Sequence, residues 1–227
     1  MPPLDYRFVW NNYDHPALLL AYDMSTRTPG GLMKNLARTG ALFDATINGA
    51  LVLAPPLIRA KRTPCMDLDG VNNYLLVPNV PVLVDTSIEA WINVDNLNTQ
   101  FISERAGFNR LAPYLINTGG PGTVVYFNNA GGLIALTKNC ATISTTFHIV
   151  CIFRAGAGNF VEIWSNGKLW IRAPSFAAND VLSDLYIGSR PTPANWLNGR
   201  MDNYRLWTIA LTPEQVQSIY KSANPRM

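Results

Sequence analysis

The carboxylates of this chain are the side chains most suited to catalysis. Their spacing argues against glycoside hydrolysis, a reaction that carboxylates support in pairs. Glycoside hydrolysis needs two carboxyl groups about 5–10 Å apart, which a strand supplies through alternating acids such as Glu-x-Asp-x-x-Glu. The four glutamates, Glu89, Glu104, Glu162 and Glu214, do not follow that pattern. Gly-x-Ser-x-Gly, His-Glu-x-x-His, P-loop and cysteine-pair motifs are absent too. The sequence therefore predicts a protein that is not an enzyme.

Aromatic rings beside amide side chains would support a second chemistry, the binding of sugars. The candidate residues are Trp164, Trp196, Tyr114, Tyr126 and Asn128. Trp196 is the most suggestive, because it lies in the Pro- and Asn-rich segment TPANWLNG between two expected strands. The alternative for each ring taken singly is packing within the core or a loop.

The composition narrows the classes of partner. Charged residues make up 15% of the 227 residues and the net charge is +3, with the densest basic cluster at residues 59–62. A nucleic-acid-binding protein would show a basic face, so we expect no such partner. No apolar run approaches the roughly 20 residues of a membrane helix. A surface poor in charge suits contact with other proteins or with sugars.

The cysteines and the N-terminus bear on where the protein is made. The three cysteines have no regular spacing, which argues against a disulfide framework. The first residues show no basic-then-apolar signal pattern. We therefore expect synthesis in the cytoplasm, a reducing compartment, without a cleaved signal peptide.

The elements that must position these side chains are strands. Short apolar runs separated by Gly, Asn, Pro and Asp predict about a dozen of them. FHIVCIFR (147–154) is apolar throughout and predicts a central strand buried on both faces. Asn166-Gly167 predicts a two-residue hairpin turn in which Trp164 faces Leu169 and Ile163 faces Trp170. Thr212-Pro213-Glu214-Gln215 carries a capping-box signature and predicts a short helix from Pro213 to about Lys221.

An ordered set of segments resembles the laminin G-like, concanavalin A-like jelly-roll domains. These segments are LLLAYDMS (18–25), KNLARTG (34–40), MDLDGVNNYLLV (66–77), SIEAWINVD (87–95), FHIVCIFRAGAGNFVEIWSNGKLW (147–170), LYIGSR (185–190) and GRMDNYRLWTIALTPEQVQSIY (199–220). The resemblance covers about residues 18–222. It implies an all-β fold of two antiparallel sheets in a jelly-roll sandwich, with a short C-terminal helix. We take residues 18–227 as a single domain.

The resemblance also implies a structural calcium ion between the first and last strands. Asp23 and Asp202 are the matching carboxylates, with Asn35 as a third oxygen donor. The paired aspartates of the family pattern are Asn72 and Asn73 here, which removes two carboxylates that could hold a cation. The alternative is that Asp23 and Asp202 cap turns or pair with arginines such as Arg27, Arg200 and Arg205.

Two functions remain compatible with the sequence. The favoured one is a non-catalytic structural protein of a larger assembly, such as a decoration or fibre protein on a virus or phage particle. It rests on an aromatic N-terminal arm, residues 1–17, whose Tyr6, Phe8, Trp10 and Tyr13 lie outside the resemblance. Its partners would be other subunits, as a homo-oligomer or with capsid or tail proteins, and its location the virion. The alternative is a lectin-like adhesion module that binds glycans.

Overall fold

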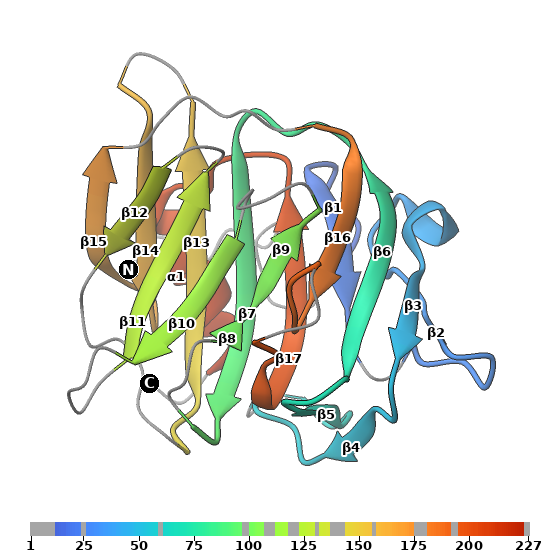
Figure 1. Cartoon of the computed structure of the whole chain (residues 1–227). Coiled ribbons are helices and arrows are strands. Elements are labelled where there is room, and N and C mark those ends of the chain that lie inside the picture. The colour runs from blue at the N-terminus through green and yellow to red at the C-terminus, as the bar shows by residue number, and fades with distance from the viewer. Residues whose placement is uncertain are drawn as a thin grey trace.

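The computed structural model describes residues 12–23, 26–58, 61–96, 100–106, 112–117, 123–129, 132–136, 144–155, 158–174, 181–191 and 195–224. Strands dominate the described residues, and one α-helix closes the chain (Figure 1). The strands are β1 (Leu18–Tyr22), β2 (Leu32–Met33), β3 (Ala45–Asn48), β4 (Val52–Ala54), β5 (Cys65–Asp69), β6 (Tyr74–Val80), β7 (Thr86–Val94), β8 (Gln100–Phe101), β9 (Ser103–Arg105), β10 (Ala112–Asn117), β11 (Thr123–Asn129), β12 (Gly132–Leu136), β13 (Phe147–Arg154), β14 (Phe160–Ser165), β15 (Lys168–Pro174), β16 (Ser183–Ile187) and β17 (Asn198–Trp207). The helices are a 3-10 turn (Gly40–Phe43) and α1 (Pro213–Ala223).

One antiparallel sheet, here called the back sheet, contains eight of the described strands in the order β15-β14-β13-β7-β17-β5-β4, with β1 also paired to β17. β17 pairs with β5 through Asn198–Met201 and with β1 through Tyr204–Trp207. Its register against β7 shifts between Asp202 and Arg205, where Asn203 has a φ of +54°. Such a bulge re-aims the strand and places Asp202 and Arg205 on one face.

The opposing layer, here called the front layer, combines the strand orders β12-β11-β10-β8 and β2-β3-β6-β16-β9. A backbone hydrogen bond from Ile102 to Pro113 (3.0 Å) joins its two parts. Figure 1 shows the front layer crossing in front of the back sheet. The main apolar core lies between them and draws on alternate residues of both, such as Ile149 and Cys151 of β13 and Leu185 and Ile187 of β16. The all-β jelly-roll sandwich predicted from the sequence is confirmed.

Helix α1 covers the other face of the back sheet, on its far side in Figure 1. The predicted capping box is present: Gln215 N–H donates to Thr212 Oγ1, and Thr212 N–H donates to Gln215 Oε1. Val216 and Ile219 of α1 pack in a second apolar cluster with Trp164. The back sheet is therefore buried on both faces, which explains why residues 147–153 of β13 are all buried. In the described residues, no helix is both long and apolar enough to cross a membrane.

The β14–β15 hairpin differs from its predicted register. The Asn166-Gly167 turn forms, with φ of +51° and +72°, and Trp164 faces Leu169 as predicted. The register then shifts, and Ile163 faces Ile171 instead of Trp170. The prediction was wrong at this pair because a bulge adds one residue to β15, which turn chemistry alone does not reveal.

Candidate functional site

Asp23 and Asp202, the two carboxylates expected to hold a calcium ion, do meet in the structure. Both are buried, and the ammonium group of buried Lys61 pairs with each of them, 3.8 Å from Asp23 Oδ2 and in a closer contact with Asp202 Oδ1. Asp202 Oδ2 also accepts the backbone N–H of Leu57 at 3.2 Å. Burial raises the pKa of Asp202, an effect that Lys61 opposes. A protein cation thus stands where the sequence resemblance implies a metal ion.

Asn35 does not join this pair as a third oxygen donor. Its Oδ1 accepts the N–H groups of Ala21 (2.8 Å) and Ala37 (3.1 Å). Its Nδ2 donates to Leu19 O (3.0 Å) and to Thr39 Oγ1 (2.8 Å). All these contacts tie the 34–39 loop to β1, so the role of this side chain is structural.

Tyr13 lies against its own domain, whereas the sequence pattern predicts it in an arm that contacts other subunits. Its hydroxyl group donates to Asp23 Oδ2 (3.2 Å) and also lies 3.4 Å from Asn203 Oδ1. The Arg205 guanidinium lies 5.6 Å from its ring centroid. Tyr6, Phe8 and Trp10 lie outside the described residues.

A buried ionic cluster lies beside this region, beneath α1. Glu89 is fully buried and its carboxylate contacts His148 Nε2 (3.4 Å), Arg205 Nη1 (3.5 Å) and Trp207 Nε1 (3.3 Å). Burial alone would raise the pKa of Glu89, but Arg205, His148 and Trp207 together lower it. The ring of Tyr220 from α1 stacks on His148, with centroids 5.8 Å apart. This cluster is closed to solvent and therefore structural.

Trp164, one of the expected sugar-binding rings, is 4% exposed beneath α1, and its indole N–H donates to Glu162 at 3.2 Å. No ligand reaches it in this fold. Tyr126 and Asn128 lie in β11 as the register partners of Tyr114 and Ala112, but their side chains lie outside the described part of the chain.

Tyr114 and the loop that carries Trp196 both contact Phe101. The Phe101 ring stacks on Tyr114 with centroids 4.7 Å apart. The loop that carries Trp196 is held beside β8, because Phe101 N–H donates to Asn195 O at 3.1 Å. Tyr114 and Trp196 are both half-buried. Of the candidate sugar-binding rings whose side chains are described, these two are partly exposed and Trp164 is buried.

From Phe101 a continuous line of side chains crosses the outer face of the front layer. The Arg190 guanidinium lies over the Phe101 ring, 5.0 Å from its centroid, and Arg190 Nε lies 3.4 Å from Glu104 Oε2. Glu104 is the cross-strand partner of Tyr186. Tyr186 stacks on Tyr74, with ring centroids 5.7 Å apart. We call these residues, together with Tyr114, the aromatic row.

The aromatic row faces away from the core. Its strand neighbours Leu75, Leu185 and Ile187 point into the core, and successive side chains of a strand point to opposite faces. α1 lies behind the back sheet in Figure 1 and leaves this face of the front layer uncovered by any described helix.

The row offers both ring faces and polar groups. Its tyrosines and Arg190 are half-exposed, whereas Glu104 is 1% exposed in its side chain. Burial, Asp184 and Tyr74 raise the pKa of Tyr186, so its hydroxyl group stays protonated at neutral pH. The row therefore combines aromatic surface with hydroxyl and guanidinium donors and carries no net charge.

Sequence reasoning missed Tyr74, Tyr186, Glu104 and Arg190. The alternation in DLYIG, with Leu185 and Ile187 on one face, was the signal that could have placed Tyr186 on the other. Glu104 and Arg190 gave no local signal, because the register of three strands and the following loop brings them together.

The family comparison agrees with this architecture. The family model described as the concanavalin A-like lectin/glucanases superfamily, of laminin G type, matches residues 69–217. The chain belongs to this superfamily and is a lectin-like jelly-roll domain. No match was found among curated proteins.

Solved structures show the same fold at low sequence identity. Domain 4 of an extracellular arabinanase from Geobacillus stearothermophilus, in complex with arabinotriose, is 17% identical with a TM-score of 0.64 over 88% of this chain and 96% of that one. The binding domain of a botulinum neurotoxin of serotype D/C is 13% identical with a TM-score of 0.64, over 91% of this chain and 52% of that one. A Trypanosoma rangeli sialidase in complex with sialic acid is 13% identical with a TM-score of 0.66, over 92% and 33%.

Proposed function

We propose that this domain binds glycans without cleaving them, and that the aromatic row holds a neutral, extended oligosaccharide. The observation that carries the proposal is the unbroken contact path from Tyr74 to Tyr114 across an uncovered sheet face. Sugar rings present an apolar face of C–H groups that packs on aromatic rings, and their hydroxyl groups need polar partners beside those rings.

The polar groups of the row match this kind of ligand. Arg190 is fixed by Glu104 on one side and by the Phe101 ring on the other, so its remaining N–H donors point in set directions at little entropic cost. Because Glu104 and Arg190 neutralise each other, the row has no charge that would favour an ionic sugar. A neutral chain of several sugar units is the ligand that fits best.

The same pair argues for binding rather than hydrolysis. A glycosidase needs one protonated carboxyl group and a second carboxylate about 5–10 Å away from it. Glu104 is held in an ion pair, with its Oε2 3.4 Å from Arg190 Nε. The nearby Asp184 accepts the backbone N–H of Asn79 at 3.0 Å. Glu104 and Asp184 therefore both make contacts that stabilise the fold.

The comparisons support the class of function. A domain of similar fold and size, from the arabinanase, is in complex with arabinotriose. The role as a particle component stays a prediction, and the aromatic row does not depend on it.

Calorimetric titration with neutral trisaccharides, arabinotriose and cellotriose among them, tests the proposal. We expect binding of at least one trisaccharide, and about tenfold weaker binding by Tyr186→Ala and by Tyr114→Ala, because each removes one stacking surface. Arg62→Gln, at an exposed position outside the aromatic row, is the control and keeps the wild-type affinity. Chromatography after a day of incubation should show the trisaccharide intact.

Two results would overturn the proposal. One is the absence of binding to any neutral oligosaccharide at millimolar concentration. The other is wild-type affinity in Tyr186→Ala and Tyr114→Ala, with their folding checked by circular dichroism. Cleavage products would instead show that the domain is a glycosidase.

A further inference from the structure

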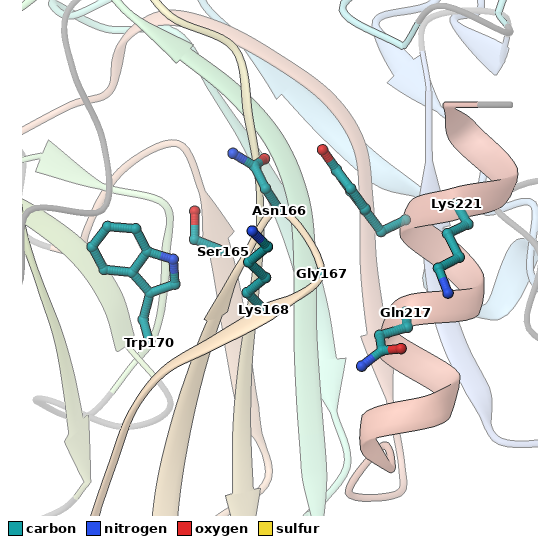
Figure 2. Close-up of a pocket in the computed structure, with 8 residues that line it drawn as sticks. Ser165, Asn166, Gly167, Lys168, Trp170, Gln217 and Lys221 are labelled. Carbon is teal, nitrogen blue, oxygen red and sulfur yellow. The ribbon is translucent and has the colours of Figure 1, made fainter. Parts of the chain in front are cut away.

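A second candidate site lies at the tip of the β14–β15 hairpin, beside α1 (Figure 2). A groove with a volume of about 590 Å³ is lined by Ser165, Asn166, Gly167, Lys168, Trp170, Gln217, Tyr220 and Lys221. Figure 2 shows Trp170 on one side of the hairpin and Gln217 and Lys221, from α1, on the other. Its size is that of a small-molecule site, and it belongs to the back sheet, not to the aromatic row.

The hairpin tip is held rigidly against β13. Asn166 N–H donates to His148 O (2.8 Å), and Asn166 Oδ1 accepts the N–H of His148 (2.9 Å). This second bond fixes the side-chain amide, so its Nδ2 donor is turned away from β13. Tyr220 packs directly on Gly167, where an added Cβ would lie 2.8 Å from its Cδ1. The walls of the groove are therefore set before any ligand binds.

The charged side chains that line the groove are both positive. Lys168 and Lys221 are exposed, and in the described part of the chain neither has a carboxylate partner. The eight lining residues include no acid. With the amides of Asn166 and Gln217 they supply N–H donors along the groove, and Trp170 supplies an aromatic wall.

We propose that this groove binds an anionic sugar, with a carboxylate or sulfate group held between Lys168 and Lys221 and the sugar ring against Trp170. The two ammonium groups supply the charge complement for the anion. The amides of Asn166 and Gln217 provide partners for ring hydroxyl groups. The site is separate from the aromatic row and does not rest on the function proposed for it.

Matched ligands isolate the role of charge. Glucuronate, glucose 6-sulfate and glucose share one ring and differ only at C6. We expect one or both anionic sugars to bind more tightly than glucose, in titrations followed by calorimetry and by the NMR signals of the tryptophan indoles. The indole signal that disappears in Trp170→Phe should shift on binding. Binding should weaken as ionic strength rises, and comparison of the two anions shows which group the groove prefers.

Variants then locate the site. Lys168→Gln and Lys221→Gln should each weaken binding of the preferred anion roughly two- to fivefold, as expected for exposed charge pairs. Lys34→Gln removes an exposed lysine of the front layer and should leave the affinity unchanged. Tyr186→Ala should also leave it unchanged, which separates this site from the aromatic row.

The proposal is overturned if neither anionic sugar binds more tightly than glucose. It is equally overturned if the double variant Lys168→Gln/Lys221→Gln, folded by circular dichroism, binds the anion as well as the wild type does.

Discussion

Lys61 donates a hydrogen bond from its ammonium group to the buried carboxylate of Asp202. The two residues lie 141 positions apart in the chain, and the contact joins the segment before β5 to the bulge of β17. Asp23, at the end of β1, is the second carboxylate within reach of the same ammonium group. This ammonium group therefore links the two ends of the fold.

Removal of the Lys61 charge should strongly destabilise the domain. Lys61→Met keeps the length of the side chain but leaves Asp23 and Asp202 together without a cation. We expect the free energy of unfolding to fall by about 3–5 kcal/mol, the usual cost of breaking a buried ion pair. Urea denaturation measures it, and Lys34→Met, at an exposed position, is the control. A loss no larger than that of the control would contradict a structural role for Lys61.

Chelation decides whether a metal ion adds to this pair. We expect the Tm of the wild type to be the same with EDTA and with calcium, because Lys61 already neutralises the two carboxylates at closest range. Differential scanning calorimetry measures the two values side by side. A Tm that falls on chelation would favour the structural calcium that the sequence resemblance implies.

The Glu89 cluster should make stability depend on pH. The pKa of Glu89 in the folded protein lies below its ordinary value of 4.5. The stability it contributes is therefore fully present above about pH 4.5 and is lost as the pH falls through the lower, folded-state pKa. Glu89→Gln should unfold more easily at pH 7 and show a flatter dependence of stability between about pH 5 and 3. The exposed Asp95→Asn is the control. An unchanged slope in Glu89→Gln would count against this mechanism.

Gly167 should tolerate no side chain. Its φ is +72°, and a Cβ would lie 2.8 Å from Tyr220 Cδ1. Gly158 has a similar φ of +82° with nothing within 4 Å of an added Cβ among the described residues. We expect Gly158→Ala to cost about 1 kcal/mol from backbone strain alone, and Gly167→Ala to cost about 2–4 kcal/mol because the collision adds to it. Equal losses in thermal denaturation would show that Tyr220 does not restrict this position.

The N-terminal arm can be tested without disturbing Tyr13. If the arm joins subunits, a chain lacking residues 1–11 should form an assembly of fewer subunits than the full chain does. Light scattering measures the number of subunits. Tyr13→Phe is the matched control: it removes the hydrogen bonds to Asp23 and Asn203 but retains the arm. An unchanged number of subunits after the deletion would contradict a role of the arm in assembly.

The parts of the fold that were predicted from the sequence have local signals. β13 is mostly apolar and is buried from residue 147 to residue 153, because both of its faces are covered. The Asn166-Gly167 turn and the Thr212 cap each depend on a few adjacent residues. By contrast, the break between β8 and β9 depends on their pairing with β10 and β16, which no local pattern encodes.

The candidate site was less predictable for the same reason. Tyr114 was identified as a ring on a strand, but the row that contains it depends on the arrangement of five strands and on a loop residue, Arg190. Trp164 was a candidate sugar-binding ring, with packing within the core as the alternative. The structure resolves that ambiguity, since α1 packs over Trp164. Lys61 lies in a segment without periodicity, so no sequence pattern predicts its contact with Asp202.

The position of β17 has a consequence for synthesis on the ribosome. This strand lies inside the back sheet and pairs with β7, β5 and β1, yet residues 198–207 are translated after all the other strands. Until they emerge from the exit tunnel, β7 and β5 have open edges and the sheet is divided. Pairing over such sequence separations is slow, and open edges invite wrong contacts. Until β17 is available the nascent domain is therefore exposed to aggregation, and protection by a chaperone would matter most just before residues 198–207 appear.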